Sequence, residues 1–329
     1  KFTMSGDALV DTGNDVYLYG GKVITVGGAL SAGDGQAAKI TPETYVEGKK
    51  VLALSATAGE GVKLSEQVKK FSLTPSEEKL IIYQTGELAR EGFSAIYISY
   101  GSEETGYEAG TIDDPAKSVK RAAELYQNAA AGTQILLCNT YELQDNEEID
   151  FSDGTKYPKK ITVKRASLCE GVMFKAAGGV TASFKNVTVD GNWKNAAGTV
   201  IADSSARILE VESGSTVTLG AGAELKNNGG TGIKNAGTVK IEGGKVTGNG
   251  GAGINNTGSL IITSGSEISG NTGQGGIYSS GSVVIEGGKV SGNGGAGIYN
   301  YGGTLTVTGG EISGNTGSSG YGIYNDKGT

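Results

Sequence analysis

The hydrophobic pattern in the last third of the chain repeats every 21 to 25 residues. A Gly-Ile pair opens the same short phrase five times, at Gly232, Gly253, Gly276, Gly297 and Gly322. Between these phrases apolar and polar residues alternate, so side chains two positions apart share one face of a strand. Self-similarity at this period predicts a solenoid, in which each repeat buries its apolar face against the next.

Aligning the repeats produces three columns of aliphatic residues, most of them β-branched, which favours strands. Gly pairs between the strands indicate corners. The sequence therefore predicts an all-β fold, a right-handed parallel β-helix with coils stacked in register. The columns are Val217, Val239, Leu260, Val283 and Leu305; Leu219, Ile241, Ile262, Ile285 and Val307; and Leu225, Val246, Ile268, Val290 and Ile312.

Two polar columns accompany the aliphatic ones and are interpreted as structural ladders. Stacked asparagines bond along a solenoid and tolerate the left-handed conformation of a corner. Opposite charges on neighbouring strands attract, so an alternating column holds the register on a solvated face. The asparagine column is Asn228, Asn249, Asn271, Asn293 and Asn315, and the charged column is Glu224, Lys245, Glu267, Lys289 and Glu311.

Pattern changes along the chain divide it into three expected segments. Residues 1–94 form a β-rich coil or cap module, and residues 95–133 contain a strand, a loop and a helix. Residues 134–329 form the β-helix proper. The helix is expected at residues 115–131, with Asp113 or Asp114 as its cap and Pro115 at its first position. Its place before the regular coils suggests that it covers the end of the stack.

Composition narrows the range of possible functions. The net charge is −7, and no basic cluster appears, which argues against nucleic-acid binding. No apolar run is long enough to insert this segment into a membrane. Histidine is absent, which removes the usual general base and most zinc sites, so we expect no catalytic residue, metal or cofactor. Cys138 and Cys169 are either buried thiols or a disulfide, and two cysteines do not decide the compartment.

Two places are candidates for ligand binding. Asp190 and Asn192 lie in an irregular coil with Trp193, the only tryptophan, whose ring can stack on a sugar. The alternative is that Trp193 simply covers apolar surface. Tyr278, Tyr299 and Tyr324 form an outward column that either binds glycans or proteins or packs on itself.

Parts of the chain resemble known proteins. The runs from Phe2 to Val26, from Ala38 to Tyr45 and from Phe71 to Pro75 resemble a module of large repetitive surface proteins of treponemal spirochaetes. Residues 96–99 and 110–115 are similar to the start of a pectin-lyase-like β-helix in the same proteins. The resemblance covers nearly the whole chain and implies an architecture and a bacterial cell-surface, extracellular setting. It implies little about activity.

The two ends of the sequence look complementary. Residues 322–329 read like the first half of a coil, and residues 1–10 like a second half. One interpretation is a cut from a longer chain with flanking copies. The other is that the protein is its own partner, stacking end to end into filaments through a heterologous contact.

From these patterns we expect a non-catalytic structural or adhesive surface protein that serves as a rigid spacer. The alternatives are an adhesin that binds host or matrix glycans or proteins, and a polysaccharide-degrading enzyme of the pectin-lyase type. The enzyme needs paired carboxylates or clustered acidic residues with a base. In the coil region Arg165 and Arg207 are the only arginines, and the late coils repeat no Asp pair.

Overall fold

The computed structural model confirms the predicted fold class: strands make up 49% of it and helices 5%, arranged as a parallel β-solenoid of about 11 turns. It describes residues 2–11, 13–31, 36–45, 49–75, 80–82, 88–90, 95–101, 115–166, 169, 171–192, 206–317 and 320–329. The chain forms two compact units, one built mainly of residues 1–95 and one mainly of residues 134–329 with residues 96–104 and 116–129.

The first unit is a small solenoid with two parallel sheets. One sheet contains β1 (Phe2–Gly6), β3 (Ile24–Leu30) and β5 (Leu52–Leu54), and the other β2 (Val16–Leu18), β4 (Ala38–Pro42) and β6 (Phe71–Leu73). Alternate side chains of both sheets fill a core that includes Ile24, Val26 and Ile40, all fully buried. The short helix α1 (Leu64–Val68) and the antiparallel pair β7 (Leu80–Ile82) and β8 (Leu88–Arg90) complete the unit.

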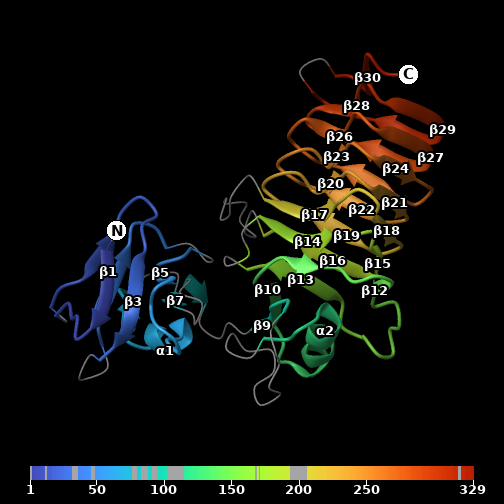
Figure 1. The fold of residues 1–329 in the computed structure, drawn as a ribbon. Helices are drawn as coiled ribbons and strands as arrows, with labels where there is room; N and C mark the ends of the chain where they lie inside the picture. Colours follow the sequence, from blue (N-terminus) through green and yellow to red (C-terminus); the bar gives the residue numbers. More distant parts are fainter. Residues whose placement is uncertain are drawn as a thin grey trace. The chain divides into compact units, whose positions relative to one another are not determined.

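The second unit is a β-helix with three faces (Figure 1). The first face contains β12 (Glu147–Asp150), β15 (Thr181–Lys185), β18 (Thr216–Gly220), β21 (Thr238–Glu242), β24 (Ser259–Ile262) and the first parts of β27 (Ser282–Ser291) and β29 (Thr304–Ser313). The second contains β9 (Ala95–Ile98), β10 (Gln134–Leu137), β13 (Ile161–Arg165), β16 (Val187–Asp190), β19 (Glu224–Lys226), β22 (Lys245–Thr247), β25 (Glu267–Ser269) and the later parts of β27 and β29. The third contains β11 (Tyr141–Glu142), β14 (Val172–Ala176), β17 (Arg207–Val211), β20 (Ile233–Asn235), β23 (Ile254–Asn256), β26 (Gly275–Ser279), β28 (Ala296–Tyr301) and β30 (Ile323–Asp326).

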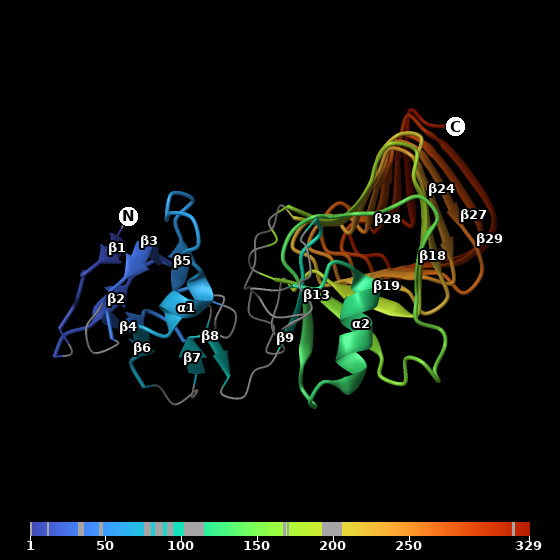
Figure 2. The ribbon, with the colours of Figure 1, turned by 60° about the horizontal axis from the view of Figure 1, so that its bottom comes forward.

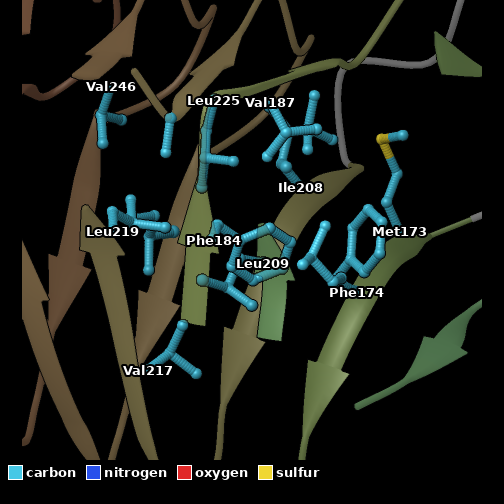
Figure 3. Packing of buried hydrophobic residues seen from close by; sticks show 14 of the residues in the cluster. Met173, Phe174, Phe184, Val187, Ile208, Leu209, Val217, Leu219, Leu225 and Val246 are labelled. Carbon is cyan, nitrogen blue, oxygen red and sulfur yellow. The ribbon is translucent and has the colours of Figure 1, made fainter. Parts of the chain in front are cut away.

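The register repeats from coil to coil. Val239 of β21 lies opposite Val217 on one side and Leu260 on the other, and Ile254 lies between Ile233 and Ile277. Each coil therefore places like residues on like residues, as the aligned columns predicted. The resulting core is a stack of aliphatic and aromatic layers, seen in Figure 3 around Phe174, Phe184 and Leu219.

Helix α2 (Val119–Asn128) lies at the end of the β-helix near β9 and β10 (Figure 2). Val119, Ala122 and Ala123 are buried in the β-helix core. The helix is shorter than the expected 115–131 because Ala116 pairs with Ile98 in a β-bridge, which keeps the chain extended there. The cap is Ser118, whose Oγ accepts a hydrogen bond from the Arg121 N–H at 3.1 Å. The expected caps, Asp113 and Asp114, lie outside the described residues.

Candidate functional site

Of the first candidate site, the structure describes Asp190 and Asn192, while Trp193 lies outside the described residues. The Asp190 carboxylate accepts hydrogen bonds from the Asn192 backbone N–H at 2.8 Å and from Asn227 Nδ2 at 2.9 Å. Asn192 has a positive φ of 53° and donates from Nδ2 to the Arg165 carbonyl at 3.1 Å. Both side chains therefore hold the shape of this corner.

The second candidate, the tyrosine column, is brought together by the register of the third face. Tyr278 lies opposite Tyr299, and Tyr299 opposite Tyr324. The ring centroids of the first pair are 5.2 Å apart with an interplanar angle of 24°, and those of the second pair are 4.8 Å apart. Tyr299 thus has a ring against each of its faces, and the column packs on itself.

Two more tyrosines extend this stack into a cluster that the sequence analysis did not include. Tyr321 lies 5.2 Å from Tyr324 and is 47% exposed, and Tyr301 lies 6.4 Å from Tyr299 and receives Lys327 Nζ over its ring at 5.0 Å. The sequence signal that could have identified these two tyrosines was their position in the repeat, next to the column. We call the set Tyr278, Tyr299, Tyr301, Tyr321 and Tyr324 the tyrosine cluster.

A pocket of about 490 Å³ opens beside the tyrosine cluster. Tyr299, Tyr321 and Tyr324 form one wall, and Gln274 and Ala296 contribute to the lining. The remaining lining residues are glycines of neighbouring coils. These are Gly273, Gly294, Gly295, Gly317 and Gly320.

The surroundings of Tyr299 raise the pKa of its hydroxyl group. Removal from water raises the pKa of Tyr299, and the neighbouring Tyr324 and Asp326 raise it further. The phenol therefore stays protonated at neutral pH. It can both donate and accept a hydrogen bond, as a neutral phenol does.

The asparagine column forms a continuous ladder inside the β-helix. The N–H of Asn228 donates to Oδ1 of Asn249 at 3.2 Å, and the same bond recurs from Asn249 to Asn271 and from Asn271 to Asn293, both at 3.1 Å. The last bond, from the N–H of Asn293 to Oδ1 of Asn315, is 3.0 Å long. All but Asn315 are fully buried, so the ladder satisfies backbone groups that water does not reach.

A second ladder, which the sequence analysis missed, follows the third face. Asn235 Nδ2 donates to Asn256 Oδ1 at 2.7 Å, and Asn300 Nδ2 donates to Asn325 Oδ1 at 2.7 Å. Ser279 stands where the other coils have asparagine, and Asn300 Oδ1 is buried without a hydrogen-bond donor. The signal was present in the repeated phrase, whose fourth position reads Asn, Asn, Ser, Asn, Asn.

A buried arginine stands at the start of the first ladder. Arg165 is 4% exposed and donates to the Oδ1 of Asn228 at 3.1 Å. Its other N–H groups bond four backbone carbonyl oxygens, those of Cys169, Gly171, Gly191 and Arg207, at 2.7 to 3.3 Å. Burial lowers the pKa of Arg165 and raises the pKa of Cys169, whose Sγ lies 3.9 Å from the guanidinium.

The charged column is in register, but its contacts form separate pairs. Lys245 Nζ lies 2.8 Å from Glu267 and Lys289 Nζ lies 3.2 Å from Glu311. Glu224 instead contacts Lys226 of its own strand, at 3.3 Å. These side chains are partly exposed, so each pair contributes little to stability.

Within the part of the chain that the structure describes, no group of three or more His, Cys, Asp or Glu side chains could hold a metal ion. Cys138 and Cys169 are not joined to each other in a disulfide bond. Among the described helices, none has the length and hydrophobicity needed to cross a membrane.

Comparisons with known proteins found no match for this chain. No family model matches the chain, no curated protein resembles it in sequence, and no solved structure matches it.

Proposed function

We propose that the protein is a non-catalytic, structural component of an extracellular bacterial surface, in which the β-helix serves as a rigid spacer. The observation that carries this proposal is the in-register stacking of coil on coil, which continues through β27 and β29 despite local register shifts after Ile285. Its three faces, its aliphatic core and its asparagine ladder all run along the same axis. A solenoid of this kind keeps its two ends at a fixed distance, because each coil is fixed to the next by backbone and side-chain bonds.

The buried polar groups support stiffness in particular. Inside the ladder, Asn271 and Asn293 use Nδ2 toward both neighbouring coils: Asn293 Nδ2 donates to Asn315 Oδ1 at 2.9 Å and to the Ile268 carbonyl at 3.1 Å. A tilt between coils would break such bonds where water cannot replace them. Bending therefore costs more here than in a solenoid with only an apolar core.

The chemistry of the described residues supports a non-catalytic role. The Asp190 carboxylate is engaged by Asn192 and Asn227, and Arg165 is enclosed by carbonyl oxygens. Product analysis on acidic and neutral polysaccharides tests this point, and release of oligosaccharides by the purified chain would refute it.

We also propose that the rod associates end to end, with residues 322–329 of one copy against residues 1–10 of another. Val307 and Ile323 are 44% and 43% exposed, whereas Ile285 and Ile298, one coil earlier in the same columns, are buried. In β1, the apolar residues Phe2 and Met4 lie two positions apart, as the apolar residues Leu305 and Val307 do in β29.

The two surfaces differ in cross-section, because the β-helix has three faces and the first unit has two sheets. The proposed contact therefore joins the edge strands β29 and β1 rather than whole coils. Val307→Lys tests it, since a charge in this column opposes burial. We expect sedimentation to show association of the unaltered chain that the variant loses, with Thr306→Lys, on the exposed face of β29, as the control. If the chain is monomeric at all concentrations, the end-to-end contact is contradicted. The remaining interpretation is then that flanking coils of a longer chain cover the exposed columns of β29 and β30.

A specific observation favours adhesion as a second function of the same rod. The pocket beside the tyrosine cluster is a concave site on the β-helix. Small-molecule sites in proteins occupy roughly 300–1,000 Å³, so this pocket is large enough to hold a ligand.

A further inference from the structure

The pocket beside the tyrosine cluster is not needed for the stacking of the coils. The aliphatic core and the asparagine ladders already join these coils, and Gln274 and Tyr321, which line the pocket, are exposed residues outside the strands. A concave surface with several aromatic side chains is a common form of binding site.

The aromatic wall offers a particular set of contacts. Tyr278 and Tyr324 stand on either side of Tyr299 in the column, so its ring faces are occupied and the side chain is half-buried. Tyr321, with 47% of its surface exposed, supplies an accessible ring at the end of the row. The wall therefore combines polar hydroxyl groups with one open apolar surface.

The floor of the pocket is bare backbone, and the stacking explains why. A Cβ atom on Gly295 would lie 2.6 Å from the Gln274 carbonyl carbon, and one on Gly317 would lie 2.7 Å from the Gly295 carbonyl carbon. Side chains are thus excluded by the neighbouring coil. A ligand can approach the main chain closely where glycines stand in a row.

The charges identify the class of ligand. None of the described residues that line the pocket is charged, which disfavours a nucleic acid or an acidic polysaccharide, because both require basic partners. A proline-rich peptide also fits poorly, since such peptides dock in aromatic-lined grooves, and these rings are only 4.8 to 5.2 Å apart and leave no slot between them.

We propose that this pocket binds a linear, uncharged glycan that lies along the axis of the β-helix. Sugar rings combine hydroxyl groups, which match the tyrosine hydroxyls, Gln274 and the backbone, with an apolar face that suits Tyr321. The rings of the tyrosine column repeat at about the strand spacing of ~4.8 Å, which is comparable to the length of one sugar unit in an extended chain. The proposal goes beyond the spacer role and does not depend on it.

The test is a titration of the intact chain with uncharged oligosaccharides derived from cellulose, chitin, mannan and galactan, followed by calorimetry. Hyaluronan and pectate oligosaccharides serve as acidic probes. We expect at least one uncharged series to bind, with affinity rising with chain length. Tyr321→Ser and Gln274→Ala should each weaken binding by about tenfold, the loss of one aromatic or hydrogen-bonding contact.

Tyr17→Ser is the matched control, because Tyr17 is 59% exposed and belongs to β2 of the first unit, not to the tyrosine cluster. It should bind as the unaltered chain does, and circular dichroism should show that all three variants are folded. The proposal is overturned if no uncharged oligosaccharide binds at millimolar concentration, if only acidic ones bind, or if the Tyr321 and Gln274 variants bind unchanged. None of these results would affect the spacer proposal, which is tested by the shape of the molecule.

Discussion

At the scale of single residues, the β-helix depends on buried polar side chains that have their partners. Arg165 shows this most clearly, because its five donors meet five oxygen atoms in a space closed to water. No pattern in the sequence pointed to this role, since an arginine at the end of a strand looks like a surface residue. Only the fold places the acceptors around it.

Replacing Arg165 should be among the most damaging substitutions in the chain. Arg165→Met leaves buried carbonyl oxygens without donors, so we expect a loss of stability on the order of 3 kcal/mol or more. Denaturant unfolding measures it. The control is Arg207→Met, because the Arg207 side chain is 39% exposed and pairs with Glu210 at the surface. Similar midpoints for the two variants would refute the role of Arg165.

The gap in the second ladder predicts a stabilising substitution. Ser279→Asn would supply an amide donor for Asn300 Oδ1, which has none, and would repeat the arrangement of Asn235 and Asn256. One net hydrogen bond is worth about 1 kcal/mol, so thermal unfolding should shift upward. Ser280→Asn, at the exposed neighbouring position, should have no such effect. A lower midpoint for Ser279→Asn would show that this coil has no room for the longer side chain.

At the scale of elements, much of the architecture could be predicted and some of it could not. The period of the aliphatic residues gave the strands and their register, because a slip of one residue would turn each apolar side chain to solvent. The start of α2 was misplaced, since the β-bridge between Ala116 and Ile98 depends on a contact distant from the helix signals. The tyrosine column was visible, but that its rings cover each other's faces follows only from their orientation in space.

The charged column predicts a measurable pH dependence. Hydrogen bonding to Lys245, and then to Ser269, lowers the pKa of Glu267 below its usual value. A lowered carboxyl pKa stabilises the folded state above the pKa of the unfolded chain, and this stabilisation is lost as pH falls through the folded pKa. Glu267→Gln should therefore lower the thermal midpoint at neutral pH, and its effect should shrink as pH falls below the usual carboxyl range of about 4.

The control for this prediction is Glu242→Gln, an exposed glutamate in β21. Because the Lys245–Glu267 pair is largely exposed, the difference should be small and should decrease with added salt. A Glu267→Gln effect that persists unchanged at low pH would mean that the side chain acts through packing rather than through its charge.

At the scale of the whole molecule, the account rests on the β-helix as a rod. Its end near β9 is covered by α2, whereas β29 and β30 present columns with exposed Val307 and Ile323. The most direct test is electron microscopy of the intact chain across a concentration series. We predict that the β-helix unit appears as a straight segment of constant width and length at every concentration, and that particles join end to end as the concentration rises. A β-helix segment that bends or varies in length from particle to particle would contradict the rigid spacer.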